Sequence, residues 1–280
     1  MNPPTLSIVI PAYNEENRIG PTLEGIVRYL GSRDVSFELL IVDDGSTDGT
    51  LERIDQFARQ ANLPGQVHIH RNDTNRGKGY SVRRGMLEAQ GDLALFTDAD
   101  LSAPIEELAK LEKEVVEGGS DIAFGSRDVQ GSDVQIHQPW WRETSGKIFN
   151  QFVRLLTGLP YRDTQCGFKL FRLSRCTDLF EQQTLFDFGF DVELLYLARK
   201  WGLAIKEVPV VWRHSPDSKV QFVPHAFEML VDLFKIRWND VRGRYETTDH
   251  RPQTTDHRPQ TTDHRPQTTD HRQRIVIPAG

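Results

Sequence analysis

The feature that most constrains the fold is a regular alternation of short apolar runs with amphipathic segments over the first 125 residues. The apolar runs have the length of buried strands and lie at Leu6–Pro11, Glu38–Val42, Val67–His70, Leu93–Thr97 and Ile122–Gly125. Helical spacing occurs between them, at Glu16–Leu30, Thr50–Ala61, Lys78–Ala89 and about Pro104–Glu117. This rhythm predicts the α/β class, with a doubly wound, mostly parallel sheet that is flanked by helices and joined by right-handed crossovers.

The C-terminal end of the chain has a different character. The heptad Thr-Thr-Asp-His-Arg-Pro-Gln starts at Thr247, repeats at Thr254 and Thr261, and begins again at Thr268. Each copy is polar, so it has no face to bury, and it lacks the apolar a and d positions of a coiled coil. We therefore predict one folded domain over residues 1–245 and a disordered heptad-repeat tail over residues 246–280.

Charge and cysteine content exclude several classes of protein. The formal net charge is -6, which argues against a nucleic-acid-binding protein. The two cysteines, Cys166 and Cys176, are too few for a disulfide framework and are expected to be free thiols in a reducing compartment. No window approaches the roughly 18 apolar residues of a membrane span, so we expect a soluble or peripheral protein.

Candidate binding residues lie at the ends of the first, second and fourth predicted strands, where ligands bind on a doubly wound sheet. They are Pro11, Tyr13 and Glu15, then Asp43 and Asp44, then Asp98, Ala99 and Asp100. Asp43 and Asp44 suit hydrogen bonds from a base and a ribose hydroxyl, or they are ordinary turn residues. Asp98 and Asp100, one residue apart, suit Mg²⁺ or Mn²⁺, which would neutralise a leaving diphosphate.

A further candidate lies where the third predicted helix begins. Asn75–Gly79 places glycines and Lys78 at the start of that helix, where backbone amides and a lysine suit a phosphate. The stretch lacks the Gly-x-x-x-x-Gly-Lys-Ser/Thr pattern of a P-loop. Arg83 and Arg84 follow on the helix, either as phosphate ligands or as a solvated basic face.

Together these residues resemble family 2 glycosyltransferases of the GT-A fold over about residues 5–245. The likeness extends to dolichyl-phosphate β-glucosyltransferases and to the related polyprenyl-phosphate mannosyltransferases. It is carried by the stretches Asn75–Gly79, Arg162–Phe171 and Phe190–Tyr196. The resemblance implies a nucleotide-sugar donor, a Mg²⁺ or Mn²⁺ cofactor and a polyprenyl-phosphate acceptor.

The resemblance also implies roles for individual residues. The nucleoside pocket would be lined by Pro11, Tyr13, Glu15, Asp43 and Asp44. Asp98 and Asp100, on either side of Ala99, would hold the metal and diphosphate, and Lys78 and Lys219 would lie against the diphosphate. Arg127 would face the phosphates or the acceptor. The residues expected beside the donor sugar and acceptor are Asp163, Gln165 and Asp191. The predicted catalytic set is Asp100, Arg127, Asp163 and Asp191.

The nature of the acceptor decides what those carboxylates do. A hydroxyl acceptor needs a general base, whereas a lipid phosphate is already anionic and needs cations that position it. Arg127, Arg142 and Lys147 are candidates for that task, with surface charge as the alternative for Arg142 and Lys147. For a phosphate acceptor, Asp163 and Asp191 are expected to bind a sugar hydroxyl or to accept structural hydrogen bonds.

Two aromatic and basic segments could meet a membrane. They are Pro139–Leu156 and Phe222–Val241, and the second has a broad apolar face with Lys235, Arg237, Arg242 and Arg244 near its end. Such a helix lies in the membrane interface, or it packs on the sheet or forms a homo-oligomer. We expect a peripheral protein on the cytoplasmic face of a membrane.

The function predicted from sequence is inverting, metal-dependent transfer of glucose from UDP-glucose to a polyprenyl or dolichyl phosphate. Transfer of mannose from GDP-mannose and transfer to a hydroxyl acceptor remain open. A catalytically silent nucleotide-sugar-binding protein is a non-enzymatic alternative, and the intact Asp98-x-Asp100 pair argues against it.

Overall fold

The computed structural model describes residues 4–61, 63, 65–136, 140–213 and 222–245. At residues 136, 140–143 and 222–227 it describes the backbone alone. All the described residues belong to one compact unit, Met1–His250. The heptad-repeat tail predicted at 246–280 lies outside the described residues and stays a prediction.

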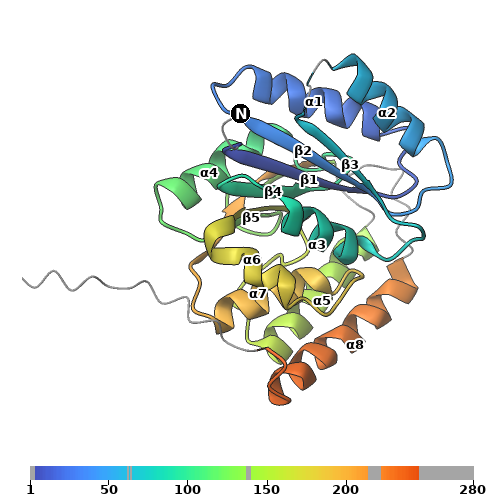
Figure 1. Ribbon diagram of the computed structural model, residues 1–280. Coiled ribbons are helices and arrows are strands. Elements are labelled where there is room, and N and C mark those ends of the chain that lie inside the picture. Colours follow the sequence, from blue (N-terminus) through green and yellow to red (C-terminus); the bar gives the residue numbers. More distant parts are fainter. Residues whose placement is uncertain (1–3, 62, 64, 137–139, 214–221, 246–280) are drawn as a thin grey trace, which may run out of the picture. The chain divides into compact units, whose positions relative to one another are not determined.

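A mixed sheet forms the centre of this unit (Figure 1). Its order is β3-β2-β1-β4-β7-β5-β8. The strands are β1 (Leu6–Ala12), β2 (Phe37–Asp43), β3 (Val67–Arg71), β4 (Leu93–Thr97), β5 (Ile122–Ser126), β7 (Phe168–Arg172) and β8 (Ile205–Pro209). All neighbours pair in parallel except β7, which runs antiparallel to both β4 and β5. A separate parallel pair is formed by β6 (Asp133–Ile136) and β9 (Val211–Arg213).

Helices cover both faces of the large sheet. On one face lie α1 (Ile19–Gly31), α2 (Thr50–Gln60) and α4 (Leu108–Val116), with the 3-10 helix η1 (Ile105–Glu107) preceding α4. On the other face lie α3 (Lys78–Glu88), α6 (Leu173–Glu181) and α7 (Phe190–Lys200). Two longer helices, α5 (Trp140–Thr157) and α8 (Phe222–Val241), pack against each other beyond α7.

The strand sequences explain the two layers. Side chains alternate between the faces of a strand, and every residue of β1 is buried. Ile8 and Ile10 join the apolar core beneath α1, whereas Val9 joins the core beneath α3. In β4, Leu95 and Phe96 divide between the same two cores. Apolar residues on both faces require helices on both faces, so the predicted α/β class is confirmed.

The strands and helices predicted in the first 125 residues are all present. The predicted strand Leu93–Thr97 coincides with β4, and the other elements differ from the prediction at one end or both. The first helix begins at Ile19 rather than Glu16, because the amides before it bond to the loop after β2 and to the first residue of α2. The Asn14 amide donates to Ser46 Oγ at 2.9 Å and the Glu15 amide to Thr50 Oγ1 at 2.6 Å. The segment predicted as one helix from Pro104 is η1 followed by α4.

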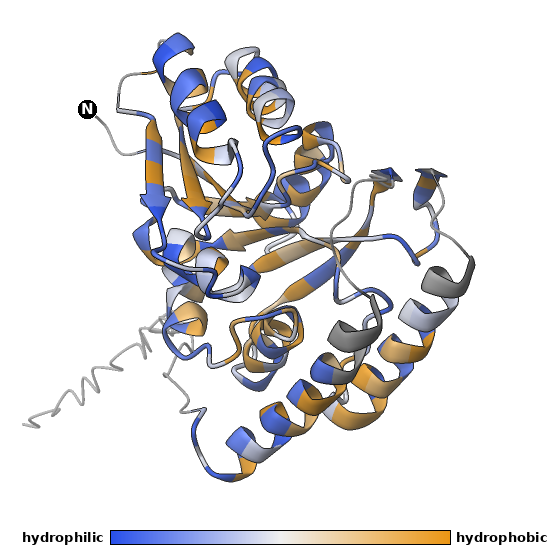
Figure 2. Ribbon diagram, turned by 90° about the vertical axis from the view of Figure 1, so that its right-hand side faces the viewer, coloured by the Kyte–Doolittle hydropathy of each residue, from blue (hydrophilic) through white to orange (hydrophobic). Residues whose placement is uncertain are grey.

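The two segments predicted to meet a membrane form the helices α5 and α8. Figure 2 shows α5 and α8 side by side, each with apolar residues along its described length. Within the described part of the chain, no helix combines the length and the apolar content that a bilayer crossing needs.

The antiparallel β7 buries a lysine at the centre of the sheet. Lys169 is fully buried, and its Nζ donates to the Cys166 carbonyl and to Asp191 Oδ1, both at 2.6 Å. The ammonium also lies 5.2 Å from the centre of the Phe96 ring. Burial raises the pKa of Asp191, and the Lys169 and Lys78 cations offset only part of this. The pair therefore joins β7 to α7 through a hydrogen-bonded charge in the core.

We expect Lys169→Met to lower the free energy of unfolding by about 3–5 kcal/mol, because it leaves the Asp191 carboxylate buried without its ion-pair partner. The double variant Lys169→Met/Asp191→Asn should recover much of that loss. Urea unfolding followed by circular dichroism measures both changes. Equal stability of the single and double variants would contradict a role for the charge pair.

Candidate active site

The loops after β1, β2 and β4 lie together at the carboxyl edge of the sheet. The Asp44 amide donates to the Ala12 carbonyl at 2.8 Å, and Thr22 Oγ1 donates to the Ala99 carbonyl at 2.7 Å. The structure thus gathers the residues predicted to bind the donor, apart from Lys219, which lies outside the described residues.

The loop after β1 reaches the second aspartate of the Asp98-x-Asp100 pair through an arginine. Arg18 donates from Nε and Nη2 to the two carboxylate oxygens of Glu15, each at 2.6 Å. Its Nη1 lies 3.4 Å from Asp100 Oδ2. Arg18 was missed from the sequence because it fell inside the first predicted helix. Glu15, a predicted donor residue, is therefore an ion-pair partner of Arg18. The Arg18 guanidinium also lies close to the Asp100 carboxylate.

Asp43 and Asp44 differ in the hydrogen bonds that their carboxylates accept. Asp44 accepts hydrogen bonds from Asn72 Nδ2 at 2.7 Å, from the Arg76 amide at 3.0 Å and from the Gly77 amide at 2.9 Å. These bonds occupy both of its oxygens and fix the loop that precedes α3. Asp43 is fully buried and has weaker contacts: the Ser46 amide lies 3.3 Å from both of its oxygens, and Arg71 Nε lies 3.6 Å from Oδ2. The Asp43 carboxylate therefore has more hydrogen-bonding capacity left for a nucleoside than the Asp44 carboxylate.

Two further predicted donor residues line the same edge. Pro11 is the last but one residue of the buried strand β1, and Tyr13, directly after that strand, is 40% exposed. An exposed aromatic ring at this edge offers a flat apolar surface against which a base can pack.

The fixed loop before α3 aims a lysine at the first metal candidate. Gly77 has φ 96° and precedes Lys78, the first residue of α3, whose Nζ lies 2.6 Å from Asp98 Oδ1. Burial lowers the pKa of Lys78, but the Asp98 carboxylate more than offsets this, helped by Asp191 and Asp100, so the pKa is raised. Lys78 thus remains a cation where a diphosphate would meet the predicted metal site.

Asp98 and Asp100 are held in place by backbone contacts. The Asp98 amide donates to the Gly167 carbonyl at 3.2 Å, and the Ser102 amide donates to Asp100 Oδ1 at 3.0 Å. A Cβ atom at Gly167 would lie 2.1 Å from Asp98 Oδ2. Leu101, which directly follows Asp100, has φ 46°, in the left-handed region that L residues rarely adopt. This backbone presents both carboxylates at the edge of the sheet.

The two carboxylates fit a divalent cation that shares its ligands with a substrate. The described residues contain no group of three or more His, Cys, Asp or Glu side chains that could hold a metal alone. Mg²⁺ is often bound by one or two carboxylates with substrate phosphates and water completing the shell. The side chains of Asp98 and Asp100 are 34% and 17% exposed, so both face solvent at this edge.

Two residues predicted for the acceptor side, Arg127 and Asp163, form a second charged pair. Arg127 donates from Nε to Asp163 Oδ2 at 2.6 Å and from Nη2 to Asp163 Oδ1 at 2.8 Å. Its backbone amide donates to the same carboxylate at 3.0 Å. The guanidinium also lies 5.2 Å from the Trp212 ring. Asp163 occupies Nε and Nη2 and leaves Nη1 outside the pair, so the arginine has a fixed orientation and one nitrogen to offer.

Gln165 and Asp191, which were also predicted to border the donor sugar and acceptor, already have partners within the protein. The Gln165 amide donates to Asp163 Oδ1 at 3.3 Å, and Asp191 is tied to Lys169. Burial raises the pKa of the Cys166 thiol to about 12, so this cysteine is no thiolate nucleophile. Both cysteines are free and buried, as expected. Arg142 lies in α5 among the residues whose side chains are not described.

Comparison with known proteins assigns the family. The sequence matches glycosyl transferase family 2 over residues 7–180. The chain belongs to this family. It is a glycosyltransferase, as the sequence predicted.

Curated relatives cover most of the chain. A dolichyl-phosphate beta-glucosyltransferase of Dictyostelium discoideum is 31% identical over 85% of this chain and 75% of its own length. The corresponding values are 35%, 82% and 74% for the Drosophila melanogaster enzyme, and 33%, 86% and 76% for that of Saccharomyces cerevisiae.

A solved structure supports the fold. Glucosyl-3-phosphoglycerate synthase from Mycobacterium tuberculosis, solved with Mn²⁺, UDP and glucosyl-3-phosphoglycerate, matches with a TM-score of 0.62. It is 18% identical over 83% of this chain and 80% of its own. The predicted GT-A fold of the glycosyltransferase is confirmed.

We expect Gly167→Ala to lower the kcat/KM of the glycosyltransferase by about 10²-fold, since the new Cβ must displace Asp98 and a misplacement near 1 Å has that effect. Gly31→Ala is a matched control, because nothing lies within 4 Å of its added Cβ. Steady-state transfer rates test this, and circular dichroism confirms that both variants fold. Wild-type kcat/KM in Gly167→Ala would show that the position of Asp98 is unimportant.

The Arg127–Asp163 pair predicts a pH-dependent stability. Burial raises the pKa of Asp163, but the charge and hydrogen bonds of Arg127 more than offset this and leave the pKa lowered. A lowered folded pKa gives stability that is fully present above the unfolded value of about 4 and is lost as pH falls through the folded pKa.

Asp163→Asn should therefore cost roughly 1–3 kcal/mol of unfolding free energy at neutral pH, with a smaller difference from wild type near pH 3. The exposed Asp34→Asn is the control and should change little at either pH. Urea unfolding at several pH values measures the difference. A constant difference across that range would contradict the charge-pair explanation.

Proposed function

We propose that this glycosyltransferase transfers glucose from UDP-glucose to a polyprenyl-type lipid phosphate, with inversion at the anomeric carbon. The observation that carries the acceptor class is that both predicted acceptor-side carboxylates are engaged in ion pairs. Asp163 is held by Arg127, and Asp191 is held by the buried Lys169. A hydroxyl acceptor needs a general base, whereas an anionic phosphate does not. The named activity of the curated relatives supports the same acceptor.

The donor side of the proposal rests on the carboxyl edge of the sheet. Tyr13 and Asp43 would receive the nucleoside, and Asp98 and Asp100 would hold Mg²⁺ or Mn²⁺. The cation would neutralise the leaving diphosphate when bound. The structural relative that contains Mn²⁺ together with UDP supports this choice of metal and nucleotide.

Cationic side chains of the protein would stabilise the negative charges of the leaving diphosphate and of the acceptor phosphate. Lys78 already lies at the edge that receives the diphosphate and adds a fixed positive charge there. Arg127 would present Nη1 to the acceptor phosphate, while Asp163 keeps its plane from turning. Such prearranged charges stabilise a developing anion without reorganisation during the reaction. In-line attack by the acceptor oxygen then gives the β-linked lipid-phosphate sugar.

We place this enzyme peripherally at the cytoplasmic face of a membrane through α5 and α8. Exposed apolar residues lie on both helices: Ile148, Phe152 and Leu155 on α5, and Val231, Phe234, Trp238 and Val241 on α8. The Arg242 guanidinium stacks 4.5 Å from the Trp238 ring. Aromatic and basic side chains around an apolar stripe favour a membrane interface. A homo-oligomer that buries the same stripe is the competing outcome.

We expect the purified protein to transfer labelled glucose from UDP-glucose to a short polyprenyl phosphate in detergent with Mg²⁺ or Mn²⁺. Asp100→Ala should abolish transfer while the protein still folds, because the cation loses one of its two proposed protein ligands beside the diphosphate. GDP-mannose and a simple sugar acceptor are tested in parallel, and EDTA should stop the reaction.

The outcomes separate the alternatives. Lipid product from GDP-mannose alone would correct the donor, and product on the hydroxyl acceptor alone would correct the acceptor class. Donor binding without any product would favour a silent binding protein. Full activity of Asp100→Ala would exclude the proposed metal site.

A further inference from the structure

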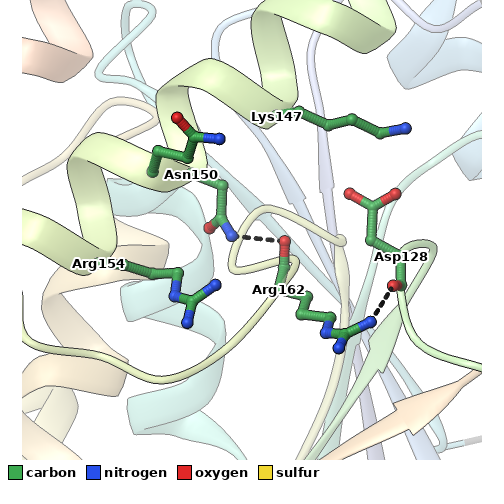
Figure 3. A pocket seen from close by; sticks show the side chains of 6 residues that line it. Asp128, Lys147, Asn150, Arg154 and Arg162 are labelled. Carbon is green, nitrogen blue, oxygen red and sulfur yellow. Dashed lines mark hydrogen bonds between the residues drawn. The ribbon is translucent and has the colours of Figure 1, made fainter.

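A cationic cavity lies on the outer side of the Arg127–Asp163 pair. It has a volume of about 350 Å³, and its described lining residues are Asp128, Lys147, Asn150, Gln151, Arg154 and Arg162. Figure 3 shows Lys147 and Arg154 reaching from α5 toward the loops that carry Asp128 and Arg162. Asp128 follows Arg127 in the chain and Arg162 precedes Asp163, so the cavity borders the acceptor-side pair without including it.

Cationic side chains outnumber carboxylates among the described lining residues of this cavity. Three cations line it, against one carboxylate among the described lining residues. Neither Lys147 nor Arg154 forms an ion pair with a described residue. Arg162 makes one weak side-chain contact, from Nη1 to the Asp128 carbonyl at 3.5 Å. Converging cations without carboxylate partners are the arrangement that binds a phosphate group.

The cavity is also fixed in shape. Asn150 Nδ2 donates to the carbonyls of Tyr161 and Arg162, at 3.1 Å and 2.6 Å. The Arg162 amide in turn donates to both carboxylate oxygens of Glu207 on β8, at 3.0 Å and 3.1 Å. The loop that carries Arg162 is therefore tied both to α5 and to the sheet, and the cations meet in a defined space.

The position of the cavity on α5 indicates what kind of phosphate reaches it. Lys147, Gln151 and Arg154 are spaced as one face of the helix. Ile148, Phe152 and Leu155 are each one residue further along and form the neighbouring exposed apolar face. A cationic face beside an exposed apolar face is complementary to an anionic headgroup with acyl chains next to it.

We propose that this cavity binds the headgroup phosphate of an anionic membrane phospholipid and thereby orients the enzyme at the bilayer. The proposal rests on the peripheral membrane placement given above. The headgroup site is separate from the acceptor: the acceptor phosphate belongs at Arg127, and the headgroup phosphate belongs at Lys147, Arg154 and Arg162.

The test is vesicle flotation of the full chain with two compositions, phosphatidylcholine alone and an equal mixture of phosphatidylcholine and phosphatidylserine. The variant Lys147→Gln/Arg154→Gln removes two cations that have no described ion-pair partner. The matched control, Arg53→Gln/Lys113→Gln, removes the same charge from exposed positions on α2 and α4, away from α5 in Figure 1.

We expect the cavity variant to bind the mixed vesicles roughly 30-fold more weakly than wild type, since each Lys or Arg near an anionic surface contributes about fivefold. Its preference for mixed over neutral vesicles should disappear, and the control should stay within about twofold of wild type. Added salt should reduce the wild-type preference as well.

Transfer to polyprenyl phosphate in detergent separates this proposal from the proposed function. The KM for that acceptor should be the same in wild type and in the single variant Arg154→Gln, which removes a cavity cation but keeps Lys147. Absence of transfer in every protein would refute the proposed function and leave the vesicle result standing. Equal vesicle binding by the cavity variant and wild type, or an equal loss in the control, would overturn the headgroup site. A raised KM with unchanged vesicle binding would assign the cavity to the acceptor and also overturn it.

Discussion

The buried ion pair between Lys169 and Asp191 is the contact on which the acceptor side of the site depends. Lys169 lies on β7, the strand that runs against its two neighbours at the centre of the sheet. Its reversed direction brings the preceding residues, including Asp163 and Gly167, to the same edge as the end of β4. A buried ion pair is costly unless hydrogen bonds satisfy its remaining groups, and the Cys166 carbonyl supplies one here. The pair therefore fixes the register of the segment that holds both Asp98 and Arg127.

A second theme is that the anionic and cationic groups of the site are already matched before any substrate arrives. Lys78 lies on Asp98, Arg18 lies near Asp100, and Arg127 lies on Asp163. Each cation keeps its position through a carboxylate that is itself held by the backbone or by burial. A diphosphate that binds beside Asp98 thus meets positive charge whose orientation has been fixed by folding. That is the condition under which electrostatic stabilisation is most effective, since little reorganisation accompanies the reaction.

Much of this arrangement follows from sequence pattern, because strands buried on both faces are nearly continuous apolar runs and the polar residues after them fall at one edge. The pattern fails where a contact crosses the sheet. Neither β7 nor its direction was predicted, and no periodicity shows that Lys169 is a core residue with a partner 22 positions away. Asp44 is a similar case. A carboxylate that binds backbone amides looks the same in sequence as one that binds a ribose, and only the structure shows that its oxygens are occupied.

Helix α5, one of the two helices with exposed apolar residues, leads directly into the loop that carries Asp163. Two residues separate the end of α5 at Thr157 from Pro160, and Asp163 follows three positions later. Asn150, on the cavity side of α5, bonds to the carbonyls of Tyr161 and Arg162 and so binds the helix to that loop directly. Glu207 holds the same loop from the sheet, through the amides of Arg162 and Asp163. A surface that engages α5 therefore acts on a short, doubly anchored segment whose next side chain orients Arg127. Contact at α5 is therefore coupled to the Arg127–Asp163 pair, which would receive the acceptor phosphate, through these short contacts and without a long-range movement.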